Sequence, residues 1–420
     1  INTPHKEILP VISPDGQTLY FCRWGNKDNL GDENDQDIWV SIIDSNGEWS
    51  RPRNIGFPLN NYGSNGVCSV SPDGNTLLLF GVYQPDSTIQ AGVSISHKTA
   101  NNWSYPEKLN IKNFANLSLY ASYYLANDGK TLLMCIEGAE TYGGLDVYVS
   151  FKEDGNTWTE PKNLGKTINT PFDDYSPFLA SDGVSLYFSS VGHGGFGKAD
   201  IFVSRRLDST WLNWTSPENL GETINTTGND AYYMMPASGD YAYFSSAVDM
   251  FGDMDIFRIK VPKDVQPRVA VIISGKVLNS KTGQPIDAQV YYEVLPSGLQ
   301  IGTARSNPVT GEYKITLPAG YKYGFRAEAE GFVSVNDNID LESASQYYEI
   351  KRNLELIPIV IGETIRLNNI FFDYNKSDLR DESYPELNRV VKLLFENPNI
   401  NINIQGHTDN IGDAKYNQTL

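Results

Sequence analysis

Cysteine, histidine and positive charge are all scarce in this chain of 420 residues. Its three cysteines are an odd number and form no recognisable disulfide framework, so we expect Cys22, Cys68 and Cys135 to be buried free thiols that act as small hydrophobic groups. The four histidines show no metal-ligand spacing. We therefore expect no metal site and no cofactor.

The charge balance and the hydropathy pattern exclude further classes of protein. Lysine and arginine number 33 against 51 acidic residues, and the net charge of -18 disfavours a nucleic-acid or anionic-membrane partner. No apolar run approaches the roughly 20 residues that a membrane helix needs. No Gly-x-Ser-x-Gly motif of a serine hydrolase occurs. The few arginines of the first 260 residues lie mostly in adjacent or near-adjacent pairs, which does not indicate a convergent catalytic cluster.

What the chain does contain is a repeat of about 55 residues made of short β-branched or aromatic runs. A turn aspartate recurs at intervals of 58, 55 and 54, followed 56 residues later by a looser match; these residues are Asp15, Asp73, Asp128, Asp182 and Ser238. A tryptophan followed three residues later by proline recurs as Trp49, Trp103, Trp158 and Trp214. Such a period with four strands per unit is typical of a β-propeller. We predict a mainly β protein with five blades over residues 1–262.

The fifth repeat indicates how the ring closes. It lacks the Trp-x-x-Pro-x-Asn-Leu strand, whereas the chain opens with Ile1-Asn-Thr, which matches the residues that follow this strand at Ile168 and Ile224. We expect the missing strand to lie before Ile1, and the lack of an initiator methionine or signal peptide favours a trimmed start. Otherwise the fifth blade keeps three strands and its outer edge needs another cover.

Repeated acidic residues invite a metal or catalytic interpretation, but a structural one is favoured. The turn aspartates are explained by Asx-turn hydrogen bonds beside glycine. A second set begins each third strand, and its repetition argues against catalysis, which breaks symmetry; its members are Asp37, Asp146, Asp200 and Asp255. Glu7, Asp174 and Asp230 share a position near the start of the innermost strand. They are either structural or line a channel mouth that holds a cation.

The pattern changes after a short linker that contains two prolines, residues 261–268. Alternating polar and apolar residues over 269–358 predict a small antiparallel β-sandwich. The runs Gly275-Lys-Val, Thr282-Gly-Gln-Pro-Ile and Gly311-Glu-Tyr resemble the regulatory-like sandwich of the carboxypeptidase family. That resemblance implies a spacer or docking module without chemistry of its own.

Residues 364–420 predict a third, α/β domain. Residues 370–374 and 401–405 read as strands, and a helix is expected from Asp413. Between the strands, residues 383–397 carry the apolar stripe of an amphipathic helix that Pro398 ends. The stripe consists of Leu387, Val390, Val391, Leu394 and Phe395.

The sharpest motif is Gln405-Gly-His-Thr-Asp-Asn-Ile-Gly412, which resembles the end of the second strand of OmpA-like peptidoglycan-binding domains. The resemblance implies a site for the diaminopimelate of a peptidoglycan stem peptide, in which Asp409 takes the ammonium group and amide groups at a helix start take the carboxylate. The site residues it implies are Phe372, Asp373, His407, Thr408, Asp409, Asn417 and Leu420. The family's partner arginine falls past Leu420, so the domain is expected to be incomplete. Without this context, His407 reads as a loop histidine and Asp409 as a helix N-cap.

The order of a TolB-like propeller, a sandwich and an OmpA-like domain resembles PorE-type proteins of the Bacteroidota type IX secretion system. It implies a non-enzymatic periplasmic scaffold, associated with the outer membrane, that anchors envelope or secretion-system proteins to peptidoglycan. The alternative is a propeller that binds or hydrolyses a glycan or peptide, because residues 153–158 resemble the Asp-box turn of sialidases.

Overall fold

The computed structural model describes residues 1–32, 34–247, 254–360, 367, 369–396, 398 and 401–407. Within these residues, 1–261 form four four-stranded antiparallel sheets and one three-stranded sheet. The first is β1 (Lys6–Ile12), β2 (Thr18–Trp24), β3 (Gln36–Ile42) and β4 (Arg53–Asn54), and the second is β5 (Val67–Val70), β6 (Thr76–Tyr83), β7 (Ile89–His97) and β8 (Glu107–Lys108).

The third sheet is β10 (Ser122–Leu125), β11 (Thr131–Ile136), β12 (Asp146–Phe151) and β14 (Lys162–Asn163). The fourth is β15 (Asp174–Leu179), β16 (Ser185–Ser190), β17 (Asp200–Arg205) and β18 (Glu218–Asn219). The fifth is β19 (Asp230–Met234), β20 (Tyr241–Ser246) and β21 (Asp255–Lys260). A short parallel pair, β9 (Asn110–Ile111) with β13 (Thr157–Trp158), joins the second and third repeats.

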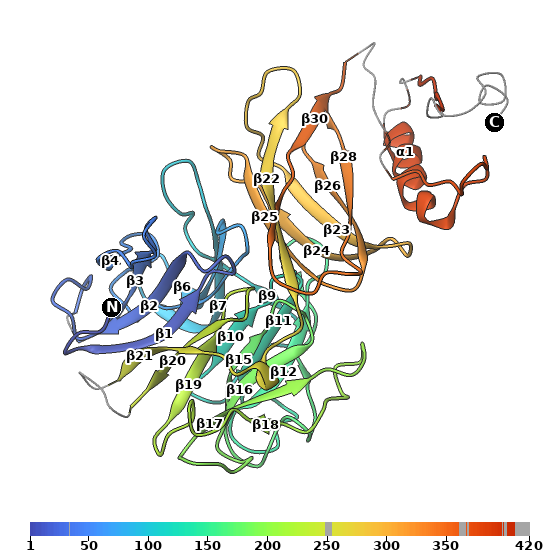
Figure 1. Cartoon of the computed structure of the whole chain (residues 1–420). Coiled ribbons are helices and arrows are strands. Elements are labelled where there is room, and N and C mark those ends of the chain that lie inside the picture. Colours follow the sequence, from blue (N-terminus) through green and yellow to red (C-terminus); the bar gives the residue numbers. More distant parts are fainter. Residues whose placement is uncertain are drawn as a thin grey trace.

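The first strands of the five sheets contact one another in sequence, and β19 contacts β1, so the sheets form a closed, propeller-like ring (Figure 1). Strands such as β11 and β16 are buried along their whole length because each sheet packs between two neighbours. One hydrophobic core runs through all five sheets and includes Leu79, Leu133 and Tyr187. The predictions of a mainly β chain and of a propeller-like first region are confirmed.

Buried asparagines tie the first, third and fourth sheets of the ring to the linkers that leave them. The Asn169 side chain accepts a hydrogen bond from Val147 N (2.7 Å) and donates to Val147 O (3.0 Å), and Asn60 and Asn225 make the same pair of bonds to β3 and β17. Asn2 makes it to Ile256 N and O, at 3.1 and 3.0 Å. The chain start therefore closes the ring onto β21, in the position that the Ile-Asn-Thr repeat predicted.

Two further sheets share a second core and form a sandwich region, drawn yellow to orange above the ring in Figure 1. One contains β22 (Ala270–Asn279), β25 (Glu312–Pro318), β27 (Phe332–Val333), β29 (Glu349–Lys351) and β30 (Leu354–Pro358). The other contains β23 (Gln289–Leu295), β24 (Leu299–Arg305), β26 (Lys322–Glu328) and β28 (Val335–Asp340). The expectation of purely antiparallel pairing is wrong, because β22 pairs in parallel with β29 and β30. Both strands follow β28 of the other sheet and then run in the same direction as β22.

The sandwich region and the linker dock on the turns between the first and second strands of the ring sheets. Each turn aspartate binds its own turn, as Asp182 does by accepting from Val184 N (2.9 Å), which confirms the Asx-turn interpretation. In three of these aspartates, the other carboxylate oxygen accepts a hydrogen bond from the linker or the sandwich region. Asp182 accepts from Arg268 N (2.9 Å), Asp73 from Arg305 N (3.1 Å) and Asp15 from Lys314 Nζ (2.5 Å). One face of the ring is therefore covered.

The C-terminal described residues contain a short 3-10 turn, η2 (Asp381–Ser383), and the helix α1 (Tyr384–Glu396), which confirms the predicted helix. A second such turn, η1 (Lys263–Val265), lies in the linker. The strands predicted over 370–374 and 401–405 are wrong. Phe372 makes an isolated bridge to Leu379 rather than a strand, and residues 401–405 are exposed and join no ladder among the described residues. The helix expected from Asp413 lies outside the described residues. Helices in the described parts fall short of the length and apolarity needed to cross a membrane.

Candidate functional site

The predicted peptidoglycan site is described only in part. Phe372 pairs with Leu379 in an isolated antiparallel bridge, and Phe372 is 49% exposed. Asp373 binds Lys376 Nζ at 3.2 Å, and His407 is exposed. Thr408, Asp409, Asn417 and Leu420 lie outside the described residues. The structure therefore places Phe372 and Asp373 on one exposed hairpin-like turn.

The helix that follows this turn is held against the sandwich region by a buried polar network. Arg389 on α1 donates to both carboxylate oxygens of Glu293 on β23, at 2.9 and 3.2 Å, and to Glu386 at 2.7 Å. Asn336 on β28 donates to Glu386 at 2.7 Å. Glu293 and Glu386 are buried, so hydrogen bonds from these partners must compensate each carboxylate for its lost contact with water. The network fixes the orientation of α1.

The carboxylates near the start of the innermost strands hold the linkers between sheets. Asp174 accepts from Thr170 N and Asp230 from Thr226 N, both at 2.6 Å. Glu7 accepts from Thr3 N at 3.0 Å and also pairs with Arg23 at 2.7 Å. Burial raises the pKa of Asp174 to about 6. Within the described parts of the chain, no three His, Cys, Asp or Glu side chains form a metal-binding group. The contacts of Glu7, Asp174 and Asp230 with the linkers support a structural role for these acids.

The cysteines are free thiols, as expected, in the described structure. Cys22 and Cys135 are fully buried, whereas Cys68 is partly exposed. Burial raises the pKa of Cys22 to about 12, so the reactive thiolate is scarce at neutral pH.

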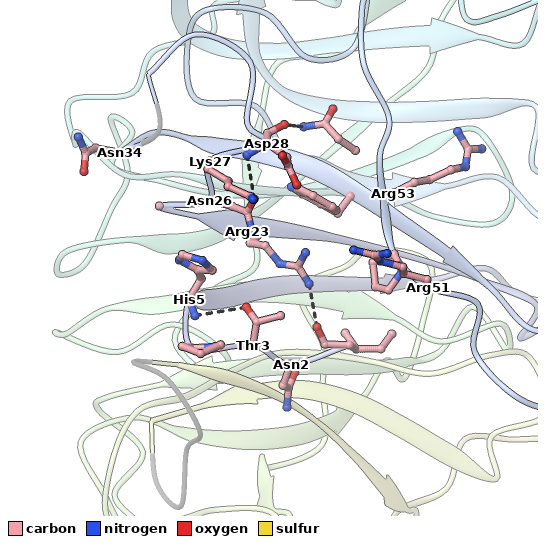
Figure 2. A pocket seen from close by; sticks show the side chains of 16 residues that line it. Asn2, Thr3, His5, Arg23, Asn26, Lys27, Asp28, Asn34, Arg51 and Arg53 are labelled. Carbon is pink, nitrogen blue, oxygen red and sulfur yellow. Dashed lines mark hydrogen bonds between the residues drawn. The ribbon is translucent and has the colours of Figure 1, made fainter.

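A cavity of about 850 Å³ opens beside the first sheet of the ring. The linker Ile1–His5, the loop between β2 and β3, and the segment that contains β4 form its walls. Figure 2 shows the Arg51 side chain directed toward that of Arg23, with Arg53 farther along the same segment. The rest of the lining is mainly polar and includes Asn2, Thr3, Asn26, Asn34 and Asn54. Such a lining suits a charged or hydrogen-bonding ligand better than an apolar one.

Arg23 lines the cavity, and its positive charge is balanced by Glu7. Its guanidinium donates to Glu7 Oε1 at 2.7 Å and to the Ile1 carbonyl at 2.8 Å, and it stacks over the Trp39 ring at 4.4 Å. Lys27, Arg51 and Arg53 form no ion pair with any described carboxylate. Lys27, Arg51 and Arg53 are exposed, and Asp28 is the one carboxylate among the lining residues. Figure 2 shows the Arg53 side chain directed away from those of Arg23 and Arg51.

The sequence did not indicate that Arg23, Arg51 and Arg53 line one cavity. Arg23 lies in β2, whereas Arg51 and Arg53 lie about 30 residues later, and only the fold of the first sheet brings them together. No signal in the sequence beyond the Arg51-Pro-Arg53 pair pointed to this cavity.

Several solved structures are similar to parts of the chain, with low identity and TM-scores below 0.5. One is an α-L-arabinofuranosidase from Lactobacillus brevis, with a TM-score of 0.41 and 12% identity over 63% of this chain and 93% of that one. Another is the β-propeller domain of the Trilobed protease from Pyrococcus furiosus, with a TM-score of 0.31 and 12% identity over 71% of this chain and 78% of that one. Neither similarity extends to chemistry.

The C-terminal segment matches a protein family directly. Residues 371–420 match the model of the OmpA family. The outer membrane protein Omp38 of Acinetobacter baumannii is 47% identical over 51 residues, which are 12% of this chain and 14% of that protein. Outer membrane porin F of Pseudomonas aeruginosa is 30% identical over 61 residues, 14% of this chain and 17% of that protein. The chain thus spans a small part of the length of these relatives, and its C-terminal segment is an OmpA-family domain.

Proposed function

We propose that the chain is a non-enzymatic scaffold that anchors an envelope complex to peptidoglycan. The observation that carries this proposal is the OmpA-family match over residues 371–420, which contain the Gly-His-Thr-Asp motif. Envelope association is consistent with relatives that are outer membrane proteins. The proposed location is the periplasm, with the OmpA-family segment on the cell wall.

The ligand proposed for this segment is the diaminopimelate group of a stem peptide. Asp409 would hold the ammonium group, and His407, Thr408, Asn417 and Leu420 are the other residues of this segment proposed for the site. Phe372 and Asp373 would border the site from the turn before α1, where both side chains are exposed. A carboxylate paired with a ligand ammonium in a partly enclosed loop gives a strong charge-assisted hydrogen bond.

The remainder of the chain is proposed to hold partner proteins. We propose that 1–262 are a five-bladed propeller, 269–358 a carboxypeptidase-regulatory-like sandwich and 364–420 the OmpA-like domain, in the arrangement of PorE-type proteins of type IX secretion. The docked turns support a rigid connection between the first two parts. A rigid connection suits a spacer that keeps a bound complex at a set distance from the wall.

Binding to purified sacculi tests the anchor. The full-length protein should co-sediment with sacculi, free diaminopimelate should release it, and Asp409→Ala should reduce the bound fraction by at least about tenfold because a charge-assisted contact is lost. Asp381→Ala, which changes an exposed carboxylate before α1, is the matched control and should bind normally. Retention of Asp409→Ala on sacculi at the level of the control would refute the site.

The hydrolase alternative is less well supported by the cavity beside the first sheet. Glycoside hydrolysis by the usual mechanisms requires two carboxyl groups flanking the bond. Among the described lining residues, Asp28 is the one carboxylate. A screen with sialosides, arabinosides and peptides should show no turnover above background, and turnover that Asp28→Asn abolishes would favour an enzyme.

A further inference from the structure

Large apolar side chains are exposed on the face of the ring opposite the sandwich region. The sandwich region and the linker dock on turns between first and second strands. The segments that enter the first strands and the loops between second and third strands lie at the other strand ends. Because neighbouring strands are antiparallel, those segments and loops share the opposite face. On the third and fourth sheets they carry an apolar patch, which consists of Leu117, Leu119, Tyr120, Tyr142, Phe172 and Val191.

Contacts between loops place the members of the apolar patch side by side. Leu117 N donates to Glu137 O at 2.9 Å, which joins the segment before β10 to the loop between β11 and β12. A Cβ added at Gly143 in that loop would meet Phe172 N at 2.6 Å, so the segment before β15 packs on the same loop. Val191 N donates to the carbonyl of the residue after Phe172, at 3.0 Å. The patch is therefore one surface that spans two sheets.

The apolar patch lies across the ring from the start of the chain. The first strand β1 contacts β5 and β19, whereas β10 and β15 contact each other on the far side of the ring. The strand predicted before Ile1 belongs to the fifth sheet, so it adds to neither of the two sheets that carry the patch.

The segment that carries three of these side chains is fixed by hydrogen bonds. Asn116 Nδ2 donates to Ser118 O and Tyr120 O, both at 3.0 Å, and Asn116 Oδ1 accepts from Glu137 N at 2.9 Å. Leu119 is 96% exposed and Tyr120 74% exposed. A segment already held in one conformation loses little conformational entropy on binding. Exposed apolar groups gathered on such a segment mark an interaction surface.

Carboxylates border the apolar patch and restrict what can cover it. Glu137, Glu140 and Asp173 form no ion pair within the described parts of the chain. Lys166 also borders the patch and lies over the Tyr142 ring at 5.4 Å. An anionic membrane would be repelled by these carboxylates, and a symmetric second copy would place them against their own counterparts. A partner with positive charge is therefore favoured.

We propose that the apolar patch binds a segment of a partner protein that carries lysine or arginine beside apolar side chains. The apolar side chains of the segment pack on Leu119 and Tyr120, and its cations pair with Glu137 and Glu140. Three of the six members of the patch are aliphatic and offer no flat ring face to a sugar, which favours a protein partner over a glycan. This inference rests on the proposed scaffold function and names the chemistry of its partner.

Fluorescence anisotropy with the full-length protein tests this surface. The probe is a short fluorescein-labelled peptide in which lysine alternates with leucine and phenylalanine. One comparison peptide carries glutamine in place of lysine, and another carries serine in place of the apolar residues; the probe should bind more tightly than either. Leu119→Ser/Tyr120→Ser should weaken binding of the probe at least about tenfold, because two apolar contacts are lost. Glu137→Gln/Glu140→Gln should weaken it several-fold, because two exposed ion pairs are lost.

The matched controls change exposed side chains of the same kinds outside the patch. They are Leu207→Ser/Leu299→Ser for the apolar contacts and Glu160→Gln/Glu355→Gln for the charges. Each control should change the affinity less than about twofold, since screening limits the effect of distant exposed charges. Failure of the lysine peptide to bind, or equal losses in the patch and control variants, overturns the proposal.

Two further measurements separate this partner from other occupants and from the anchor. A dimer in analytical ultracentrifugation that Leu119→Ser/Tyr120→Ser converts to monomer would identify a second copy as the occupant, and a chitin oligosaccharide that binds as tightly as the peptide would identify a glycan. Either result overturns the proposal. Sedimentation with sacculi should be unchanged in Leu119→Ser/Tyr120→Ser, so failure here is distinguishable from failure of the proposed anchor.

Discussion

Single polar residues repeated from sheet to sheet determine how the ring is held together. Asn60, Asn169 and Asn225 are almost fully buried, and each satisfies both backbone groups of one residue in a third strand. Their amides also donate to an asparagine of the outer strand, as Asn169 does to Asn163 at 2.9 Å. A buried side chain that bonds the backbone of one strand and a side chain of another is costly to replace, because its partners are left unsatisfied.

Replacing one such asparagine should destabilise the ring. We expect Asn169→Ala to lower the free energy of unfolding by about 2–3 kcal/mol, since three hydrogen bonds are lost and buried groups of Val147 remain unpaired. Urea unfolding followed by tryptophan fluorescence measures this. Asn46→Ala, at an exposed turn, is the control and should change stability by less than about 0.5 kcal/mol. Equal free energies of unfolding for Asn169→Ala and Asn46→Ala would contradict the role of Asn169 in holding the ring together.

Asp174 should make stability depend on pH. Its folded pKa of about 6 is raised by burial, so the folded protein keeps this proton to a higher pH than the unfolded chain does. The free energy of unfolding should therefore fall as pH rises from about 4 to about 6, by up to about 3 kcal/mol from this group. Asp174→Asn should flatten that part of the profile, while exposed Asp154→Asn should leave it as in the native protein. Denaturant melts at a series of pH values decide between these outcomes.

At the scale of elements, the helix α1 shows how tertiary contacts select which face of an amphipathic helix is docked. The apolar stripe predicted a buried face, yet Val391 is 49% and Phe395 81% exposed. Glu386 and Arg389 on the same helix bond to the sandwich region. A buried ion pair with full hydrogen bonding holds an orientation well, because removing one partner leaves an uncompensated charge.

Removal of Arg389 should release the helix. We expect Arg389→Gln to weaken docking by about 3 kcal/mol, since Glu293 and Glu386 lose their shared cation. Hydrogen exchange of the peptide 384–396 should speed up at least tenfold, consistent with local opening. Arg380→Gln removes an exposed pair with Glu382 and should leave the exchange of that peptide unchanged. Unaltered protection in Arg389→Gln would show that other contacts dock α1.

At the scale of the whole molecule, the linker between ring and sandwich is part of the packed structure. Val265 is buried and its carbonyl accepts from Tyr187 Oη at 2.6 Å, while Arg268 N donates to Asp182 at 2.9 Å. Tyr292 adds a direct bond from the sandwich region to Asn127 O at 3.0 Å. Contacts on both sides of a linker oppose hinge motion, which is otherwise the default between domains.

Loosening the linker should expose it to proteolysis. Tyr187→Phe removes the bond to Val265 and should raise the rate of tryptic cleavage after Lys263 and Arg268 several-fold, since local opening precedes cleavage. Tyr233→Phe is a close control: Tyr233 stacks on Tyr187, and its buried hydroxyl has no partner among the described residues. Limited trypsin digestion with mass spectrometry compares the two. The same rate of cleavage in both variants would show that the Tyr187 hydroxyl does not hold the linker in place.

The sequence alone determined the features that depend on local period and motif: the repeat and its turns, the helix at 384–396 and the Gly-His-Thr-Asp motif of the OmpA family. These follow from hydrophobic spacing and turn chemistry, which act over a few residues. Tertiary structure alone decided that Arg23, Arg51 and Arg53 share a cavity, that the turn aspartates carry the sandwich region, and that α1 docks by its charged face. The physical reason is that these contacts join side chains from segments far apart in the chain, and their convergence is set by packing that no local pattern encodes.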